Sequence, residues 1–474
     1  MMTAKSSSDP ALKLTIKPKS VAISPARREA FAILLELERG HSYADDLLRG
    51  QRVTALSQQD RNLCTTLVLG VLRWQIRLDS AIHPLLARPN ARLDPEIRIA
   101  LRLGGFQLLF LDRIPAHAAI GESVGLAKAA GHKFASGMVN AILRKLTVVA
   151  KPSVDVPEHL SPVELAEASG HPVWLVERWV SFYGSETARA ICLHGQQQPI
   201  VALRLDSVTA EDELAAEGIR VEAGALLTAA RVVAAGDVTA SVAFREGRVR
   251  IQEEGSQLIA ELAGSGSQIL DCCAAPGGKT LILAANNPTA RVVASEASAA
   301  RLSAMQRRLS STANQASIRR IEFRQADAAV RQDGDAFDLV LVDVPCSGTG
   351  TLGRNPEIRH RLQPADLERH HKQQCAILRA ALQSTIVGGR LVYSTCSLEP
   401  EENEAVVAEV LIEAGNWKWV SFAARIRELQ TEGRLTDSGV EHLLQCVGND
   451  GALRLLPGKL ATDGFFVVLL ERVS

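Results

Sequence analysis

The chain has 474 residues, which favours roughly two to four domains, and 46% of them are apolar, enough for a sizeable core. No uninterrupted apolar stretch reaches about 18 residues, and the basic N-terminus lacks the apolar segment of a secretion signal, so we expect a cytoplasmic protein without membrane contact. The eight cysteines form no CxxC pair, which argues against a disulfide framework or a zinc knuckle. We expect no metal ion and a monomer.

The N-terminal part divides into a polar tail and a helical domain. Residues 1–20 are predicted to be a disordered tail. Over residues 21–150 apolar residues recur at helical spacing, and Ser24 and Pro25 have the pattern of a helix cap and first helical position. The first 150 residues hold 21 Lys and Arg against 12 Asp and Glu, whereas the remainder holds 32 against 41. This asymmetry indicates an anionic partner, such as a nucleic acid, for the N-terminal domain.

Residues 151–250 are predicted to form a linker and a small α+β subdomain. Helical spacing continues over residues 161–190, followed by a strand over 201–206 and a short helix around 211–217. The segment SVAFREGRVRIQ, residues 241–252, is expected to be extended.

The pattern changes again in residues 251–474. Apolar strands alternate regularly with helices, from SQILDCC through RVVASE, IEFRQAD and FDLVLVDVP to GRLVYSTCS. This alternation predicts an α/β domain with a Rossmann-like parallel sheet covered by helices on both faces. The segments LRLLP and DGFFVVLLE near the C-terminus are expected to close it as antiparallel strands.

Polar residues follow several of these strands, at the edge where doubly wound sheets bind their ligands. The loop DCCAAPGGKT follows the first strand. It lacks GxGxxG, and the near match to a phosphate-binding Walker A loop fails because Cys273 stands where that motif needs glycine. What remains is a proline-containing turn that presents backbone N–H groups at a helix N-terminus.

A ligand with a carboxylate and a nucleoside but no phosphate suits this turn, and S-adenosylmethionine is such a ligand. Glu296 ends the second strand, 18 residues after Gly278, where an acid can accept hydrogen bonds from ribose hydroxyls. Asp327, after the third strand, is the candidate for the adenine edge.

Two cysteines are predicted to share this rim. Cys346 lies in the glycine-rich loop after Asp343, and Cys396 ends another strand. A thiolate that adds to carbon 6 of cytosine makes carbon 5 nucleophilic enough to accept a methyl group. Asp343 could hold the edge of the base, with a proton on one partner. From these residues alone, either cysteine could be the nucleophile.

The motifs DCCAAPGGKT, FDLVLVDVPCSGTG and LVYSTCSLEPEEN together resemble those of the NOL1/NOP2/Sun family of RNA cytosine carbon-5 methyltransferases. The helical part, from SPARREAFAILLELERG to GMVNAILRKL, is similar to the antitermination factor NusB. The likeness covers about residues 21–474. It implies a class I S-adenosylmethionine-dependent methyltransferase sheet, with a cytosine of 16S rRNA as substrate and a NusB-like domain that helps to bind the RNA.

The resemblance also implies roles for individual residues. Cys396 would be the nucleophile, and Cys346 would assist product release or act as a base. The cofactor would be held by residues from the first loop and from the strand ends: Cys273, Ala274, Ala275, Pro276, Gly277, Gly278, Lys279, Glu296, Asp327 and Asp343. The chain departs from the family pattern at Cys272, usually leucine, which we interpret as a packing residue, and at Glu296, usually aspartate.

Other functions are compatible with parts of the pattern. DNA cytosine methyltransferases use the cysteine of a PC motif, so Cys346 could mark a DNA enzyme, and a tRNA substrate is a further alternative. A non-catalytic RNA-binding assembly factor would not need both cysteines. A P-loop NTPase is disfavoured by Cys273.

Overall fold

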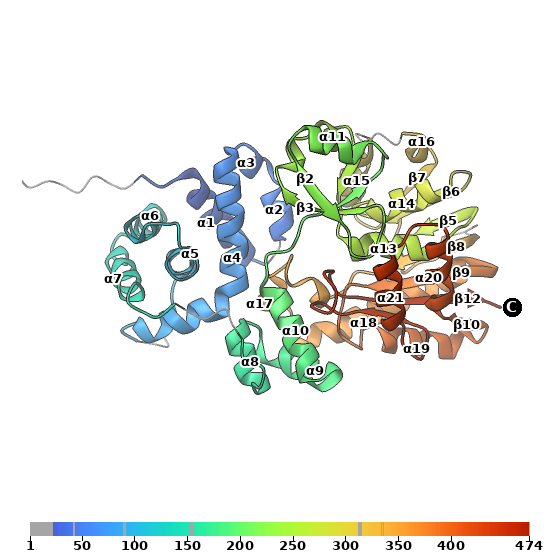
Figure 1. Ribbon diagram of the computed structural model, residues 1–474. Coiled ribbons are helices and arrows are strands. Elements are labelled where there is room, and N and C mark those ends of the chain that lie inside the picture. The colour runs from blue at the N-terminus through green and yellow to red at the C-terminus, as the bar shows by residue number, and fades with distance from the viewer. Residues whose placement is uncertain are drawn as a thin grey trace, which may run out of the picture. The chain divides into compact units, whose positions relative to one another are not determined.

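The computed structural model describes residues 22–40, 43–88, 92–151, 156–310, 315–332, 334 and 336–473, so the predicted tail over 1–20 lies outside the described residues. By its contacts the chain divides into two compact units, unit 1 (Met1–Pro152) and unit 2 (Ser153–Ser474). Figure 1 shows the elements of both. In the part of the chain that the structure describes, no helix has the length and apolarity needed to cross a membrane.

The described residues of unit 1 form helices, as predicted. They are α1 (Pro25–Glu38), α2 (Ala44–Leu48), α3 (Gln51–Thr54), α4 (Gln58–Ile82), η1 (His83–Leu85), α5 (Pro95–Phe110), α6 (Ala116–Ala129) and α7 (Ser136–Leu146). Helix α1 starts at the expected proline, but the Ser24 hydroxyl donates to Glu122 Oε2 at 2.7 Å instead of capping the helix. One apolar core joins the helices, including Leu34, Leu67, Leu101 and Leu143.

Unit 2 begins with three helices, α8 (Pro162–Ser169), α9 (Val173–Tyr183) and α10 (Ser185–Gln196). A small α+β subdomain follows, as predicted. Its elements are β1 (Ala202–Leu205), α11 (Ala210–Ala216), β2 (Arg220–Ala223), β3 (Ala230–Ala235), η2 (Val238–Ala240), α12 (Val242–Arg245) and β4 (Val249–Ile251). Its described strands pair antiparallel in the order β2-β3-β1-β4.

The prediction of an extended segment over 241–252 was wrong in its first half. Residues Val242–Arg245 form helix α12, because the Ser241 hydroxyl accepts a hydrogen bond from Phe244 N at 3.1 Å and caps the turn. Only β4 is a strand. Strands β2 and β3 were not predicted from the sequence, because both are short and half exposed.

The rest of unit 2 alternates strands and helices. The first elements are α13 (Glu254–Ala263), β5 (Gln268–Asp271), α14 (Gly278–Asn286), β6 (Arg291–Glu296), α15 (Ala299–Ser310), α16 (Gln315–Ile318), β7 (Ile321–Gln325) and β8 (Phe337–Asp343). Then come η3 (Thr349–Thr351), α17 (Ile358–Arg361), α18 (Pro364–Ser384), β9 (Thr385–Thr395), α19 (Glu404–Ala414), β10 (Trp417–Val420), α20 (Phe422–Thr431), α21 (Asp437–Gln445), β11 (Leu453–Leu455) and β12 (Phe465–Arg472).

These strands form one large sheet. Its order within the described residues is β10-β12-β9-β8-β5-β6-β7, with β11 paired to β12. Strands β5 to β9 are parallel, whereas β12 is antiparallel to β9, β10 and β11. The predicted Rossmann-like sheet with antiparallel closing strands is confirmed.

Alternate residues of each strand face the two covering layers. Leu339 and Leu341 pack with the apolar faces of α13, α14 and α20, whereas Val340 and Val342 pack with those of α18 and α19. Because both faces of β8 are buried, this strand is apolar along most of its length. Polar side chains therefore lie at the strand ends.

Candidate active site

The carboxyl ends of β5, β6, β8 and β9 lie side by side, because these strands are adjacent and parallel. The register places Asp271 opposite both Ala294 of β6 and Leu341 of β8. It also places Asp343 opposite Ser394 of β9. Residues from four separate segments are thus brought to one rim.

The loop after β5 is held by backbone hydrogen bonds. Cys272 N donates to Leu341 O at 2.9 Å, and Ala274 N donates to Ser295 O at 2.9 Å. Gly277 has a φ of +98°, which side-chain-bearing residues rarely adopt, and a Cβ atom there would lie 3.0 Å from Met305 Cγ. The loop therefore delivers the chain to the N-terminus of α14 in a single conformation. Cys272 is buried in the core, as expected for a packing residue.

Lys279 and Asp343 form an ion pair on this rim. Lys279 Nζ donates to Asp343 Oδ2 at 2.7 Å, and the Ser394 hydroxyl donates to Asp343 Oδ1 at 2.7 Å. Burial alone would lower the pKa of Lys279, but the charge and hydrogen bond of Asp343 outweigh burial and raise it, with smaller contributions from Asp271 and Cys396. The lysine is therefore a fixed positive charge beside the candidate thiols.

Glu296 is buried and already held in place. Its Oε1 accepts a hydrogen bond from Ser298 N at 3.0 Å, and its Oε2 lies 3.1 Å from the Arg301 guanidinium. Arg301 also donates to Ala275 O at 3.0 Å and so links this carboxylate to the loop after β5. Asp327 lies after β7, where it is exposed and accepts a hydrogen bond from Ala329 N at 2.9 Å.

The first carboxylate of the rim, Asp271, is buried and accepts a hydrogen bond from the Thr280 hydroxyl at 2.7 Å. Burial, aided by the charges of Asp343 and Glu296, raises its pKa to about 6. Cys273 lies among the same three carboxylates, and burial together with their charges raises the pKa of its thiol well above the ordinary value. Cys273 therefore stays protonated and is not a nucleophile.

The residues present fit a nucleoside with a charged tail. Gln252 packs against the loop, and a Cβ atom on Gly278 would lie 3.0 Å from its Cδ. Both polar atoms of the Gln252 amide are buried without a hydrogen-bond partner among the described residues. A buried unpaired amide beside a helix N-terminus and a buried acid are groups that a bound polar ligand would satisfy.

The two candidate nucleophiles lie next to each other. Cys346 Sγ and Cys396 Sγ are 3.3 Å apart, and both side chains are partly exposed. Gly350 N donates to Cys396 O at 2.9 Å, and the Thr349 hydroxyl accepts from Leu398 N at 2.8 Å. A Cβ atom at Gly350 would lie 2.8 Å from Cys396 O, so the glycine permits this close approach of the two loops.

A buried carboxylate, which the sequence analysis did not single out, joins these loops. Glu402 Oε1 accepts from Ser347 N at 2.8 Å and lies 3.1 Å from His370 Nδ1, while Oε2 accepts from the hydroxyls of Ser347 and Ser397. Burial opposes ionisation, but the hydrogen bonds from His370 and the two serines outweigh it and lower the pKa of Glu402. Ser347 and Ser397 each follow one of the cysteines, so one carboxylate sets the separation of both thiols.

Helix α9 supports the same region. Trp179 Nε1 donates to Glu399 Oε1 at 3.0 Å, and Arg178 Nε donates to Glu399 Oε2 at 2.7 Å. Glu399 is fully buried and lies three residues after Cys396. The helices before the small subdomain therefore position the loop that carries the thiol. An acidic residue shortly after the TCS motif was the sequence signal for this contact.

Comparisons with known proteins agree with this architecture. A family profile described as 16S rRNA methyltransferase RsmB/F matches residues 262–471, and a NusB family profile matches residues 24–148. A third profile, described as an RsmF/B-like ferredoxin-like domain, matches residues 171–239.

Relatives match over nearly the whole chain. The probable ribosomal RNA small subunit methyltransferase B of Bacillus subtilis is 33% identical over 94% of this chain and 98% of its own length. The ribosomal RNA small subunit methyltransferase B of Pseudomonas putida is 33% identical over 84% of this chain and 90% of its own length.

Solved structures share the fold at lower identity. The structure titled "Crystal Structure of PH0851" superposes with a TM-score of 0.75 at 22% identity and covers 96% of this chain and 100% of its own. NSun6 from Pyrococcus horikoshii with SFG superposes with a TM-score of 0.50 at 18% identity, covering 63% of this chain and 97% of its own.

Proposed function

The chain belongs to the 16S rRNA methyltransferase RsmB/F family, and on that premise we propose that it methylates carbon 5 of a cytosine in 16S rRNA. The family assignment agrees with the resemblance predicted from the three motifs and makes the chain an enzyme. The observation that carries the covalent mechanism is the pair of thiols, 3.3 Å apart, on the rim of a methyltransferase sheet.

We propose Cys396 as the nucleophile. Its thiolate forms a bond to carbon 6, and the electrons of the ring double bond move to carbon 5, which takes the methyl group. A base then removes the proton from carbon 5, the bond between carbon 6 and sulfur breaks, and the double bond re-forms as Cys396 leaves as a thiolate.

Cys346 is the candidate for assisting the release step, because its sulfur lies beside the leaving sulfur. Asp343 is the candidate for holding the base edge, where its carboxylate can accept from the exocyclic amine. Lys279 and Ser394 already fix the orientation of this carboxylate. The target base must leave any stacked helix to reach these groups.

S-adenosylmethionine, when bound, would supply the methyl group from its sulfonium, whose methyl–sulfur bond would break to leave a neutral thioether. The loop from Cys273 to Lys279 would hold it, with Glu296 accepting from the ribose hydroxyls and Asp327 close to the adenine. The extra methylene of glutamate, relative to aspartate, is compatible with this role because Arg301 and Ser298 hold the carboxylate in place.

Unit 1 would bind the RNA. Its basic surplus supports this role, since phosphate contacts dominate the affinity of proteins for nucleic acids. Arg144 and Lys145 are exposed at the end of α7. Phe134, just before the start of this helix, is exposed as well. An enzyme that modifies ribosomal RNA would act in the cytoplasm.

The alternatives are weaker on specific grounds. The assembly-factor alternative leaves both thiols and the Lys279–Asp343 pair without a use. A DNA enzyme would need Cys346 as its nucleophile, and a NusB family domain argues for RNA.

The test is methyl transfer from radiolabelled S-adenosylmethionine to 16S rRNA from cells that lack the enzyme, followed by mapping of the methylated cytosine. We expect one labelled rRNA cytosine with the wild-type protein and none with Cys396→Ala. Label in DNA or tRNA but not in rRNA would overturn the substrate, and saturable binding of ATP but not of S-adenosylmethionine would overturn the class.

A further inference from the structure

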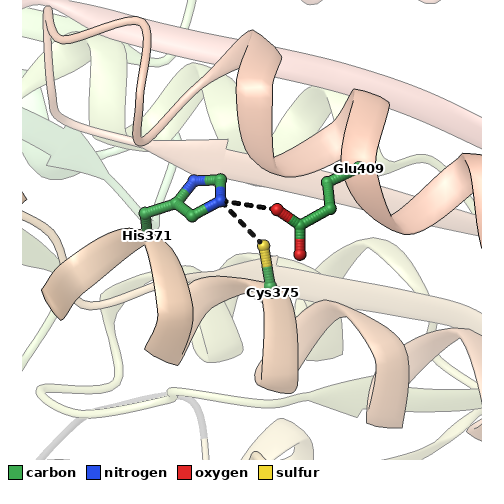
Figure 2. Close-up of side chains that lie close together, drawn as sticks. All are labelled: His371, Cys375 and Glu409. Carbon is green, nitrogen blue, oxygen red and sulfur yellow. Dashed lines mark hydrogen bonds and ion pairs between the residues drawn. The ribbon is translucent and has the colours of Figure 1, made fainter. Parts of the chain in front are cut away.

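Away from the thiol pair, three potential metal ligands converge between α18 and α19 (Figure 2). His371 and Cys375 are four residues apart on α18 and so share one face of the helix, while Glu409 comes from α19. His371 Nε2 lies 2.9 Å from Glu409 Oε2 and 3.6 Å from Cys375 Sγ. One donor atom from each side chain lies within 4.8 Å of the other two.

The histidine ring is oriented by the backbone. His371 Nδ1 lies 2.7 Å from Glu401 O, and a carbonyl oxygen can only accept, so Nδ1 carries a hydrogen. In the neutral ring, Nε2 then carries the lone pair and points toward Cys375 and Glu409. Histidines that bind metal ions are held in this way, with the second ring nitrogen donating to a carbonyl or a carboxylate.

The Glu409 carboxylate is also oriented by a hydrogen bond. Arg379 donates to Glu409 Oε1 at 2.9 Å, which leaves Oε2 as the oxygen that faces the histidine. The same guanidinium donates to Glu413 at 2.7 Å, so a second carboxylate offsets its charge. Outer hydrogen bonds of this kind fix the carboxylates of metal sites.

The separations are close to those of a tetrahedral zinc site. Zn–S and Zn–N bonds of about 2.3 and 2.1 Å, at a tetrahedral angle, place sulfur and nitrogen about 3.6 Å apart, as Cys375 and His371 are. The carboxylate oxygen would have to move away from the nitrogen by about half an ångström. Glu409 can make this adjustment because its side chain is 48% exposed, and the same exposure leaves a fourth position open to water.

We propose that His371, Cys375 and Glu409 bind one zinc-class divalent cation, with water as the fourth ligand, and that this ion fastens α18 to α19. The proposal does not depend on the function proposed above, and it departs from the expectation that the chain binds no metal. The sequence signal was the His-x3-Cys spacing within a helix, but the third ligand lies 34 residues away and only the packing of the helices supplies it.

The protonation of these groups makes the proposal pH dependent. A cation binds the thiolate form of cysteine and the neutral form of histidine, so it competes with protons for these ligands. The affinity for the cation should therefore rise with pH.

The experiment uses the metal-stripped full chain with Cys346→Ser/Cys396→Ser, which removes the other place where a soft cation could meet two sulfurs. Zn²⁺ is titrated in competition with a chromogenic chelator, and Co²⁺ is used to detect thiolate ligation through its charge-transfer absorption. We expect one ion per chain, with affinity rising between pH 6 and pH 8. We expect Cys375→Ser to remove the thiolate band and Glu409→Gln to weaken binding at least about tenfold.

The chain offers a matched control. His442 in α21 and Cys446, the residue that follows this helix, have the same spacing of four residues, but they belong to no three-ligand group among the described residues. His442→Asn/Cys446→Ser should leave the affinity and the band unchanged. Because Glu409→Gln alters an exposed side chain, it still tests the site if the Cys375→Ser variant fails to fold. Absence of binding in the parent protein, or equal loss in the α21 variant, would overturn the proposal.

Discussion

Cys346 Sγ and Cys396 Sγ lie 3.3 Å apart, although the residues are 50 positions apart in the chain. The hydrogen bond with Cys396, together with burial, raises the pKa of Cys346 well above that of an ordinary thiol. Cys346 therefore keeps its proton and can donate a hydrogen bond to the Cys396 sulfur. This asymmetry favours different roles for two residues of the same type.

The roles can be separated with RNA that contains 5-fluorocytosine, because fluorine at carbon 5 cannot be removed as a proton and the adduct persists. We expect wild type and Cys346→Ala to form a covalent complex that survives denaturing electrophoresis, and Cys396→Ala to form none. Cys446→Ser, a thiol outside the rim, should behave as wild type. Adduct formation by Cys396→Ala but not by Cys346→Ala would reverse the assignment.

Glu402 should control the geometry of the thiol pair without touching the substrate. In Glu402→Gln an amide N–H would replace an oxygen that accepts from Ser347 and Ser397. We expect unfolding to become easier by about 1–3 kcal/mol, the usual effect of an unsatisfied buried group, and kcat to fall with little change in KM for S-adenosylmethionine.

The neighbouring acid is the control for this variant. Glu401 is 40% exposed and pairs with Arg178, so Glu401→Gln should change stability by no more than about 0.5 kcal/mol. Unchanged kcat and unchanged stability in Glu402→Gln would show that the carboxylate does not position the loops.

Asp271 should make the stability of the free enzyme depend on pH. Its pKa is raised from 3.8 to about 6 in the fold, so the folded state holds this proton more tightly than the unfolded state. Its contribution to stability is then greatest below about pH 4, falls as the pH rises to about 6, and stays lost above it, by at most on the order of 3 kcal/mol.

Asp271→Asn should therefore flatten this part of the profile, because the amide oxygen can still accept from Thr280 and no charge develops. Urea unfolding at pH 5 and at pH 8 is the measurement. Asp45→Asn, an exposed acid in unit 1, is the control and should retain the wild-type difference. The same difference in Asp271→Asn would mean that another group causes it.

RNA binding by unit 1 should depend on exposed basic residues of α7. Arg144→Ala/Lys145→Ala should weaken RNA binding and reduce the slope of log affinity against log salt by about one for each phosphate that the variant no longer neutralises. Arg49→Ala/Arg52→Ala removes the same charge from guanidiniums that already pair with acids and should have a smaller effect. Equal weakening in both variants would indicate only a general effect of net charge.

Much of the fold and of the candidate site could be predicted from patterns of neighbouring residues. The strand and helix periods of residues 268–395 predicted the parallel sheet, and the strand ends identified Glu296, Asp343 and Cys396 as candidates, because side-chain periodicity is a local property. The same reasoning failed over 241–252, where one serine cap outweighed strand propensity.

Only the tertiary structure decided which of these groups meet. The order of the strands places Asp343 beside Ser394 and Cys346 beside Cys396, and helix packing places Glu409 beside His371. Contacts between residues this far apart leave no period in the sequence. They arise when the chain buries its apolar faces, and the buried carboxylate of Glu402 then holds the two cysteine loops at a fixed separation.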